Sequence, residues 1–165
     1  PPVADPLFGY RLSDPDLAVN KALALAGRSA ARDVVDIVAL HGGGFPLAAL
    51  VWAAPGKDPG FSPALLLEWI TRNASQVTAA DWRSVASTAP VEPVALKSAL
   101  LEAVDDARAA LRSLPPGPVG RLFMAPDESS MRPTPALVSG ELPKGVAALD
   151  CTMGLALARI VPDRR

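Results

Sequence analysis

Cysteine and histidine are nearly absent from this chain of 165 residues, which holds one of each, Cys151 and His41. A single cysteine excludes an internal disulfide and any zinc site built from several cysteines. A single histidine argues against a histidine-rich metal centre. It also argues against a Ser/His/Asp triad, since the sequence has no Gly-x-Ser-x-Gly motif. Cys151 follows an aspartate and has no cation nearby in sequence, so we interpret it as a structural thiol.

Aromatic residues and an excess of charge are also lacking. Aromatic residues make up 5% of the chain, and 16 Lys and Arg against 17 Asp and Glu leave a net charge of −1. This balance argues against a basic nucleic-acid scaffold. Half of the residues are apolar and 30 are alanine, which favours helices packed through small side chains over a β-sandwich. We expect one mainly α domain: a helical bundle with a short N-terminal extended segment and a small C-terminal β-hairpin.

No uninterrupted hydrophobic segment is long enough to suggest a membrane span. The longest run without Asp, Glu, Lys or Arg covers residues 37–56, but glycines at 42–44 and Pro46 divide it. The N-terminal residues show no basic region followed by an apolar core, as a secretory signal would. The expected helices also lack the Lys- and Arg-rich face of a membrane-surface helix. We therefore expect a cytoplasmic protein with no membrane partner.

Start and stop signals predict helices over about residues 16–26, 30–41, 46–54, 62–73, 78–87 and 93–114, after an extended segment at residues 7–12. Thr78 and Asp81 have the spacing of a capping box. We expect residues 1–114 to form a helical domain and residues 115–165 an appendage of it. There, residues 119–125 and 131–138 resemble the strands of an irregular hairpin, which its prolines confine to a sheet edge. Residues 139–165 give no clear prediction.

Five charged residues fall within the first two predicted helices and the turn between them: Lys21, Arg28, Arg32, Asp33 and Asp36. Lys21 lies between two leucines, each four residues away, so its ammonium lies on an apolar stripe and costs free energy unless an anion meets it. A short turn at residues 27–29 should bring Lys21 near the second helix. There Arg32 and Asp36 have i,i+4 spacing, and Asp33 and Asp36 share a face. The cluster is either a partly buried ion-pair network or a phosphate-binding lysine held by acids, with arginines that neutralise a polyphosphate.

The spacing of these residues resembles the Lys…Arg…Arg-Asp-x-x-Asp segment of the abortive-infection nucleotidyltransferase toxins, the AbiEii/AbiGii-type family. Counted from Lys21, an arginine follows at position seven, Arg-Asp at eleven and twelve, and an aspartate at fifteen. The match covers roughly residues 7–41, and the helical region that follows fits it loosely.

This resemblance implies an N-terminal nucleotidyltransferase sheet followed by a C-terminal helical region. Such proteins bind a nucleoside triphosphate with Mg²⁺ and transfer a nucleotidyl group, with tRNA ends as the acceptor in some relatives. They are the toxins of bacterial toxin–antitoxin pairs, so a cognate antitoxin is an implied partner. By the resemblance, Lys21, Arg28 and Arg32 would bind the nucleotide, with Lys21 on its triphosphate. Asp33 and Asp36 would order that lysine and complete the catalytic site.

The family's upstream Gly-Ser motif does not occur in these 165 residues, and no Asp-x-Asp in them is followed by an apolar strand, since Asp14-Pro15-Asp16 instead forms a helix start. Metal-assisted transfer needs carboxylates that hold the cations. We therefore expect the Mg²⁺ to be held mainly by residues of an N-terminal half beyond this chain. We expect this chain to be inactive alone. It opens on Pro1-Pro2-Val3 without an initiator methionine, which agrees with part of a longer protein. The alternative is a non-catalytic helical protein-interaction module, in which the same charges only brace a helix pair.

Two further residue groups have a structural and a functional interpretation. Four arginines could form a modest basic edge for RNA or, with neighbouring aspartates, a solvated face: Arg108, Arg112, Arg121 and Arg132. Three tryptophans lie on predicted helices among apolar neighbours, which indicates packing rather than base stacking: Trp52, Trp69 and Trp82. The glycines beside His41 lack the Lys-Ser/Thr of a phosphate loop and predict a turn.

Overall fold

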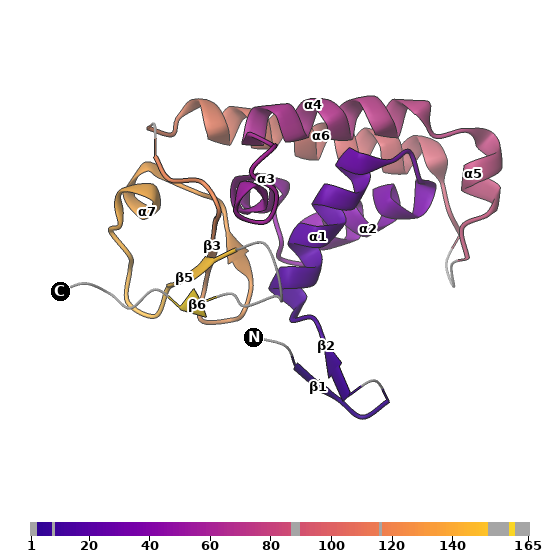
Figure 1. Cartoon of the computed structure of the whole chain (residues 1–165). Coiled ribbons are helices and arrows are strands. Elements are labelled where there is room, and N and C mark those ends of the chain that lie inside the picture. The colour runs from indigo at the N-terminus through magenta and orange to yellow at the C-terminus, as the bar shows by residue number, and fades with distance from the viewer. Residues whose placement is uncertain (1–2, 8, 87–89, 116, 152–158, 161–165) are drawn as a thin grey trace.

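A computed structural model describes residues 3–7, 9–86, 90–115, 117–151 and 159–160 of the chain (Figure 1). Its helices are α1 (Asp14–Gly27), α2 (Ala31–Gly42), α3 (Leu47–Ala53), the 3-10 turn η1 (Ala54–Gly56), α4 (Pro63–Gln76), α5 (Ala79–Arg83), α6 (Pro93–Arg112) and α7 (Pro135–Ser139). Its strands are β1 (Val3–Asp5), β2 (Gly9–Arg11), β3 (Arg121–Met124), β4 (Ser130–Met131), β5 (Ala147–Asp150) and β6 (Arg159–Ile160). The expected mainly α fold is confirmed.

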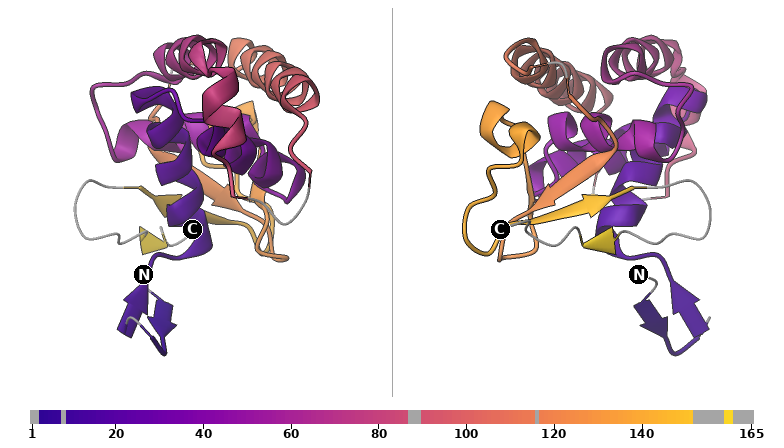
Figure 2. Two further views of the ribbon diagram at one scale, coloured as in Figure 1. Left: turned by 90° about the vertical axis from the view of Figure 1, so that its right-hand side faces the viewer. Right: turned by 60° about the vertical axis from the view of Figure 1, so that its left-hand side comes forward.

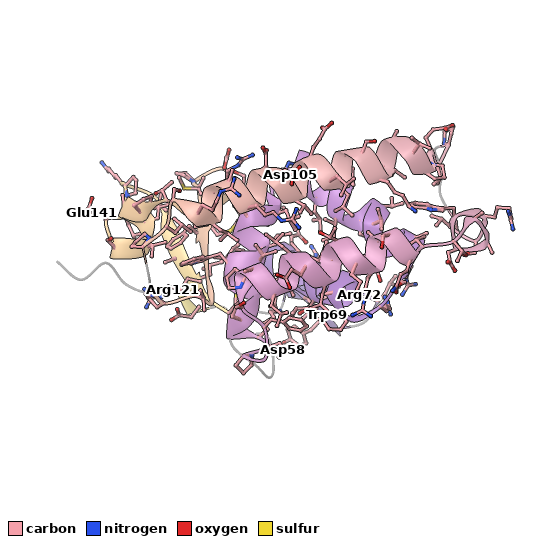
Figure 3. All side chains as sticks on the ribbon, turned by 90° about the horizontal axis from the view of Figure 1, so that it is seen from above. Asp58, Trp69, Arg72, Asp105, Arg121 and Glu141 are labelled. Carbon is pink, nitrogen blue, oxygen red and sulfur yellow. The ribbon has the colours of Figure 1, made fainter. Side chains whose placement is uncertain are left out.

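Helix α3 forms the centre of the core, and all seven of its residues are buried. Its sequence is apolar on every side, as a helix enclosed by other elements requires. It packs against α1, α4, α6 and strand β3. Helices α4 and α6 lie side by side over the other helices (Figure 3). The core therefore lies between the two long helices and the α1–α3 group.

The uncharged run at residues 37–56 is divided between two elements. Within the described residues, no single helix is long and apolar enough to cross a membrane. Helix α2 and residues Leu47–Gly56 pass that test only together, and they are bent by 110° at the break between them.

The C-terminal strands form a small antiparallel sheet in the order β4-β3-β5-β6. Strand β3 packs against α3, and a satellite cluster beneath the sheet is formed by Trp52, Phe123, Leu137, Val138 and Ala148. The predicted hairpin is confirmed as β3 and β4, with β4 at the edge, and β5 and β6 extend it into a sheet.

The prediction of a strand over residues 131–138 is wrong beyond Met131. Thr134 begins helix α7 instead, because its Oγ1 accepts a hydrogen bond from the Leu137 N–H at 3.3 Å and Pro135 occupies the first helical position. Gly140 ends the helix in the left-handed conformation, with φ +93°. The cap and the proline at its start are the signals of a helix.

The N-terminal residues form a separate two-stranded hairpin that projects from the rest of the molecule (Figures 1 and 2). Strand β2 lies within the extended segment expected at residues 7–12 and pairs with β1, with Val3 opposite Arg11. The sequence reading missed β1. The chain leaves this hairpin directly into α1, so the hairpin lies at the base of the helix that carries Lys21.

Two glycines allow the helical core and the sheet to approach backbone to backbone. Gly120, at φ +93°, donates its N–H to Trp52 O at 2.8 Å and accepts a hydrogen bond from the Cys151 N–H at 2.9 Å. A Cβ on Gly56 would overlap the Cys151 carbonyl oxygen and would lie 2.8 Å from Gly120 O. Side chains at these positions would therefore separate η1 from the sheet.

Candidate functional site

The Lys21 ammonium lies between the first two helices, as the sequence predicts. Helices α1 and α2 pack against each other, and Lys21 Nζ donates a hydrogen bond to Asp36 Oδ2 at 2.7 Å. The Lys21 side chain is 31% exposed and that of Asp36 is 36% exposed. The ion pair is therefore only half-buried, and the ammonium stays accessible from solvent while Asp36 fixes its position.

Asp33 forms the second link between α1 and α2. Its side chain is fully buried and accepts two hydrogen bonds from Arg28, from Nε at 2.7 Å and from Nη2 at 3.1 Å. This paired contact raises the pKa of Arg28 above its ordinary value, so the guanidinium stays charged. Arg32 also lies near this carboxylate, with Nε 3.9 Å from Asp33 Oδ1. The i,i+4 spacing of Arg32 and Asp36 indicated an ion pair between these two residues. In the structure Asp36 pairs with Lys21 instead, and Arg32 lies near Asp33.

The candidate residues thus do not share one hollow, and Arg28 and Asp33 line neither the hollow of Lys21 nor that of Arg32. Lys21 and Asp36 line a cavity of about 380 Å³, whose other walls are Asp14, Leu17, Ala39, Leu40, Gly43 and Phe45. Arg32 lines a separate cavity of about 360 Å³ between the start of α2 and α5. Arg28 and Arg32 are exposed, at 52% and 67%, whereas Asp33 lies beneath them. Asp33 therefore contacts the arginines and cannot itself reach a ligand in the Lys21 cavity.

The carboxylates of this cluster are poorly placed to hold Mg²⁺. Asp33 and Asp36 are each already matched by a cation 2.7 Å away, which competes with a metal for the same oxygens. Among the residues that the structure describes, no group of three or more His, Cys, Asp or Glu side chains is arranged to hold a metal ion. The cluster is suited to an anion that meets Lys21, and it does not fit a metal.

A second buried ion pair, which the sequence reading missed, anchors the start of α1. Lys57 Nζ contacts the Asp16 carboxylate, and it donates hydrogen bonds to Asp16 O at 3.1 Å and to Asn20 Oδ1 at 2.8 Å. The two charged side chains are 10% and 4% exposed. The sequence alone places Asp16 only within a helix start. No spacing rule links it to a lysine 41 residues further on, so the pair has no local sequence signal.

The single histidine and the single cysteine have structural positions. His41 lies in the last turn of α2, and its Nδ1 accepts a hydrogen bond from the Leu47 N–H at the start of α3. Cys151 is buried against the end of η1, and burial raises the pKa of its thiol to about 11. A thiol of this kind is a poor nucleophile at neutral pH. The interpretation of Cys151 as a structural thiol agrees with this position.

The arginine edge is largely neutralised by acids. Three of its four members have carboxylate partners at 2.7 to 3.2 Å: Arg108 with Asp105, Arg121 with Asp150 and Arg132 with Asp106. This arrangement matches a solvated face of alternating charge. It gives little support to an RNA-binding surface at this edge.

Two of the three tryptophans pack in the interior, as expected. Trp52 is 5% exposed and Trp82 is 7% exposed. Trp69 differs, because it lies on the outer face of α4 with 38% of its surface exposed. The Arg72 guanidinium lies 5.1 Å from its ring centroid (Figure 3). A cation–π contact of this kind partly shields an exposed ring.

Compared with family models, curated proteins and solved structures, the chain matches none of them.

Proposed function

We propose that this chain is the helical C-terminal part of a cytoplasmic nucleotidyltransferase of the AbiEii/AbiGii type, the toxin of a bacterial toxin–antitoxin pair. In this proposal Lys21 contacts the triphosphate of the nucleotide substrate. The single observation that carries it is the Lys21 ammonium, half-exposed at the wall of a cavity and held by Asp36 at 2.7 Å. The acceptor would be a nucleic acid such as tRNA, and a cognate antitoxin would be a further partner.

The position of Lys21 suits an anion that carries several oxygens. A lysine ammonium has three N–H donors. Among the described residues, Asp36 is the one hydrogen-bond acceptor within reach of Lys21 Nζ, so donors remain for a ligand in the cavity. The two acids in the cavity wall do not repel such a ligand with their full charge, because Lys21 neutralises Asp36 and Arg11 contacts Asp14 at 2.8 Å.

Each charged residue of the cluster then has a distinct part. Lys21 would donate hydrogen bonds to the triphosphate oxygens, and Asp36 would hold its ammonium in one place. Asp33 would only hold the guanidinium groups of Arg28 and Arg32 in position, because it is fully buried beneath them. In nucleotidyl transfer, an acceptor hydroxyl oxygen forms a bond to the α-phosphorus while the bond to the leaving pyrophosphate breaks, and the hydroxyl proton passes to solvent. Lys21 would stabilise the negative charge on the phosphates. The Mg²⁺ of such a reaction would be held by the family's Asp-x-Asp pair before an apolar strand, a pattern that these 165 residues lack.

Titration calorimetry of the 165-residue chain with each nucleoside triphosphate tests the role of Lys21. A charge-assisted hydrogen bond contributes about 1.5–3 kcal/mol, so Lys21→Met should weaken binding by about ten- to a hundredfold. Asp36→Asn should weaken it less, because the ammonium remains but is no longer held. Lys144→Met is the matched control, since it removes an exposed lysine that does not line the cavity. Equal affinity for wild type and Lys21→Met would contradict the proposal.

A non-catalytic interaction module is the second candidate, and the two ion-paired links between α1 and α2 favour it. Lys21–Asp36 and Arg28–Asp33 would in that case only brace the helix pair. Lys21→Met would then lower the midpoint of thermal unfolding, and no triphosphate would bind the wild-type chain. Binding that depends on Lys21, with little change in the unfolding midpoint, would favour the transferase.

A further inference from the structure

The Lys21 cavity adjoins a larger hollow that reaches the sheet. The larger hollow measures about 590 Å³ and shares two wall residues, Asp14 and Phe45, with the Lys21 cavity. Its remaining walls come from the base of the hairpin, the start of α1 and the β3–β5 region: Val3, Arg11, Ser13, Pro15, Met124, Ala125, Glu128 and Leu149. The two hollows therefore lie next to each other, with Phe45 at the junction, in the wall of both, and Lys21 in the wall of the smaller one.

The backbone holds Phe45 firmly at this junction. Its N–H donates a hydrogen bond to Leu40 O at 2.9 Å, which fixes it to the end of α2. The preceding residue, Gly44, has φ +97° and accepts a hydrogen bond from the Ser130 N–H at 2.8 Å. The turn between α2 and α3 is thereby fastened to strand β4. Phe45 itself is half-buried and packs against the core, so its ring has a defined position while part of it stays accessible.

The residues that line the two adjoining hollows match the groups of a nucleoside triphosphate. Lys21 lines the smaller hollow, Phe45 lines both, and the larger hollow has both apolar and polar walls. A nucleotide likewise has an anionic tail and a flat, largely apolar base with polar edges. Nucleobases stack on aromatic side chains irrespective of their sequence. Each hollow also has the volume of an ordinary small-molecule site.

We propose that Phe45 is the platform on which the base of the nucleoside triphosphate stacks, with the base directed into the larger hollow. This inference rests on the proposed function, because it takes Lys21 as the contact to the phosphates. Arg11, Ser13 and Glu128 line the larger hollow and supply the donors and acceptors that meet the edge of the base. Phe45 is thus a binding residue that distinguishes a nucleotide from a bare polyphosphate.

The test compares nucleoside triphosphates with inorganic tripolyphosphate, which has the phosphates but no base. Both are titrated by calorimetry into the 165-residue chain and its variants. Phe45→Leu should weaken nucleoside triphosphate binding about tenfold and leave tripolyphosphate binding within twofold, because one stacked base is lost. Lys21→Met should weaken the binding of both ligands. Phe61→Leu is the matched control, as it makes the same change at another half-buried phenylalanine that lines neither hollow.

Phe45→Trp keeps an aromatic platform and guards against a folding defect in Phe45→Leu. It should retain the preference for nucleoside triphosphates. The inference is overturned if Phe45→Leu weakens both ligands equally, or if it weakens neither. It is also overturned if the wild-type chain binds tripolyphosphate as tightly as a nucleoside triphosphate, a result that would leave the role of Lys21 intact. Absence of binding for both ligands would overturn the proposed function together with this inference.

Discussion

The buried pair of Lys57 and Asp16 gives the sharpest prediction about stability. Lys57 is 10% exposed and Asp16 is 4% exposed, and Lys57 Nζ contacts two oxygens of Asp16 and one of Asn20. Within the described residues, Asp16 Oδ2 is buried with no hydrogen-bond partner. Lys57→Met would leave a carboxylate almost fully buried without its cation. Removal of one partner of a buried pair costs about 3–5 kcal/mol.

That loss is large beside the 5–15 kcal/mol by which domains are typically stable, so the variant should be partly unfolded at low urea concentrations. Urea unfolding followed by circular dichroism measures it. Arg132→Met is the matched control, because it breaks an exposed pair with Asp106 and should cost no more than about 1 kcal/mol. The double variant Asp16→Leu with Lys57→Met should recover most of the lost free energy of unfolding, since a buried apolar pair contains no charge that needs a partner. Equal, small effects of Lys57→Met and Arg132→Met would refute the reasoning.

Three further predictions concern the packing and the titration of single groups. Gly56→Ala should lower the free energy of unfolding by about 1–3 kcal/mol or more, because the added methyl overlaps the Cys151 carbonyl, whereas Gly42→Ala, with open space at its Cβ, should not. Burial raises the pKa of the Cys151 thiol from 9.0 to about 11, so its contribution to stability is fully present below pH 9 and declines by up to about 2.7 kcal/mol toward pH 11. Cys151→Ala should flatten that alkaline decline in a pH series of urea unfolding, and an unchanged slope would contradict this. Hydrogen bonds from Thr78 hold the pKa of Asp81 in the folded state below its ordinary 3.8. The wild type should therefore be more stable than Asp81→Asn above pH 3.8. This difference in the free energy of unfolding should vanish as the pH falls through the pKa of Asp81 in the folded state.

Local signals were enough to predict most of the helices. Ser62 and Pro63 begin α4 as expected, and the Ser62 hydroxyl accepts a hydrogen bond from the Leu65 N–H. Thr78 and Asp81 form the predicted capping box at the start of α5. Such signals succeed because capping and the fixed φ of proline act within one turn of helix. The same capping signals at Thr134 and Pro135 did not lead to the prediction of a helix, because a helix of five residues is too short to show a periodic apolar pattern.

The candidate site was predictable only where its contacts are close in sequence or joined by one short turn. A lysine on an apolar stripe requires an anionic partner. The short turn between the first two helices leaves few acidic side chains that could be this partner. Asp36 fills this position at 2.7 Å. The ion pair between Arg28 and Asp33 depends instead on the directions of the side chains at the end of α1. The Lys57–Asp16 pair and the larger hollow beside Phe45 join segments far apart in the chain, so they emerge only from the packed structure.

The central claim is that the Lys21 cavity binds a triphosphate, and two-dimensional NMR of the labelled 165-residue chain tests it most directly. On titration with a nucleoside triphosphate, the account predicts that the largest shift changes fall on residues of the cavity wall, Lys21, Asp36 and Phe45 among them. It also predicts that these changes disappear in Lys21→Met. Changes centred on the separate Arg32 hollow, or no changes at all, would contradict the account.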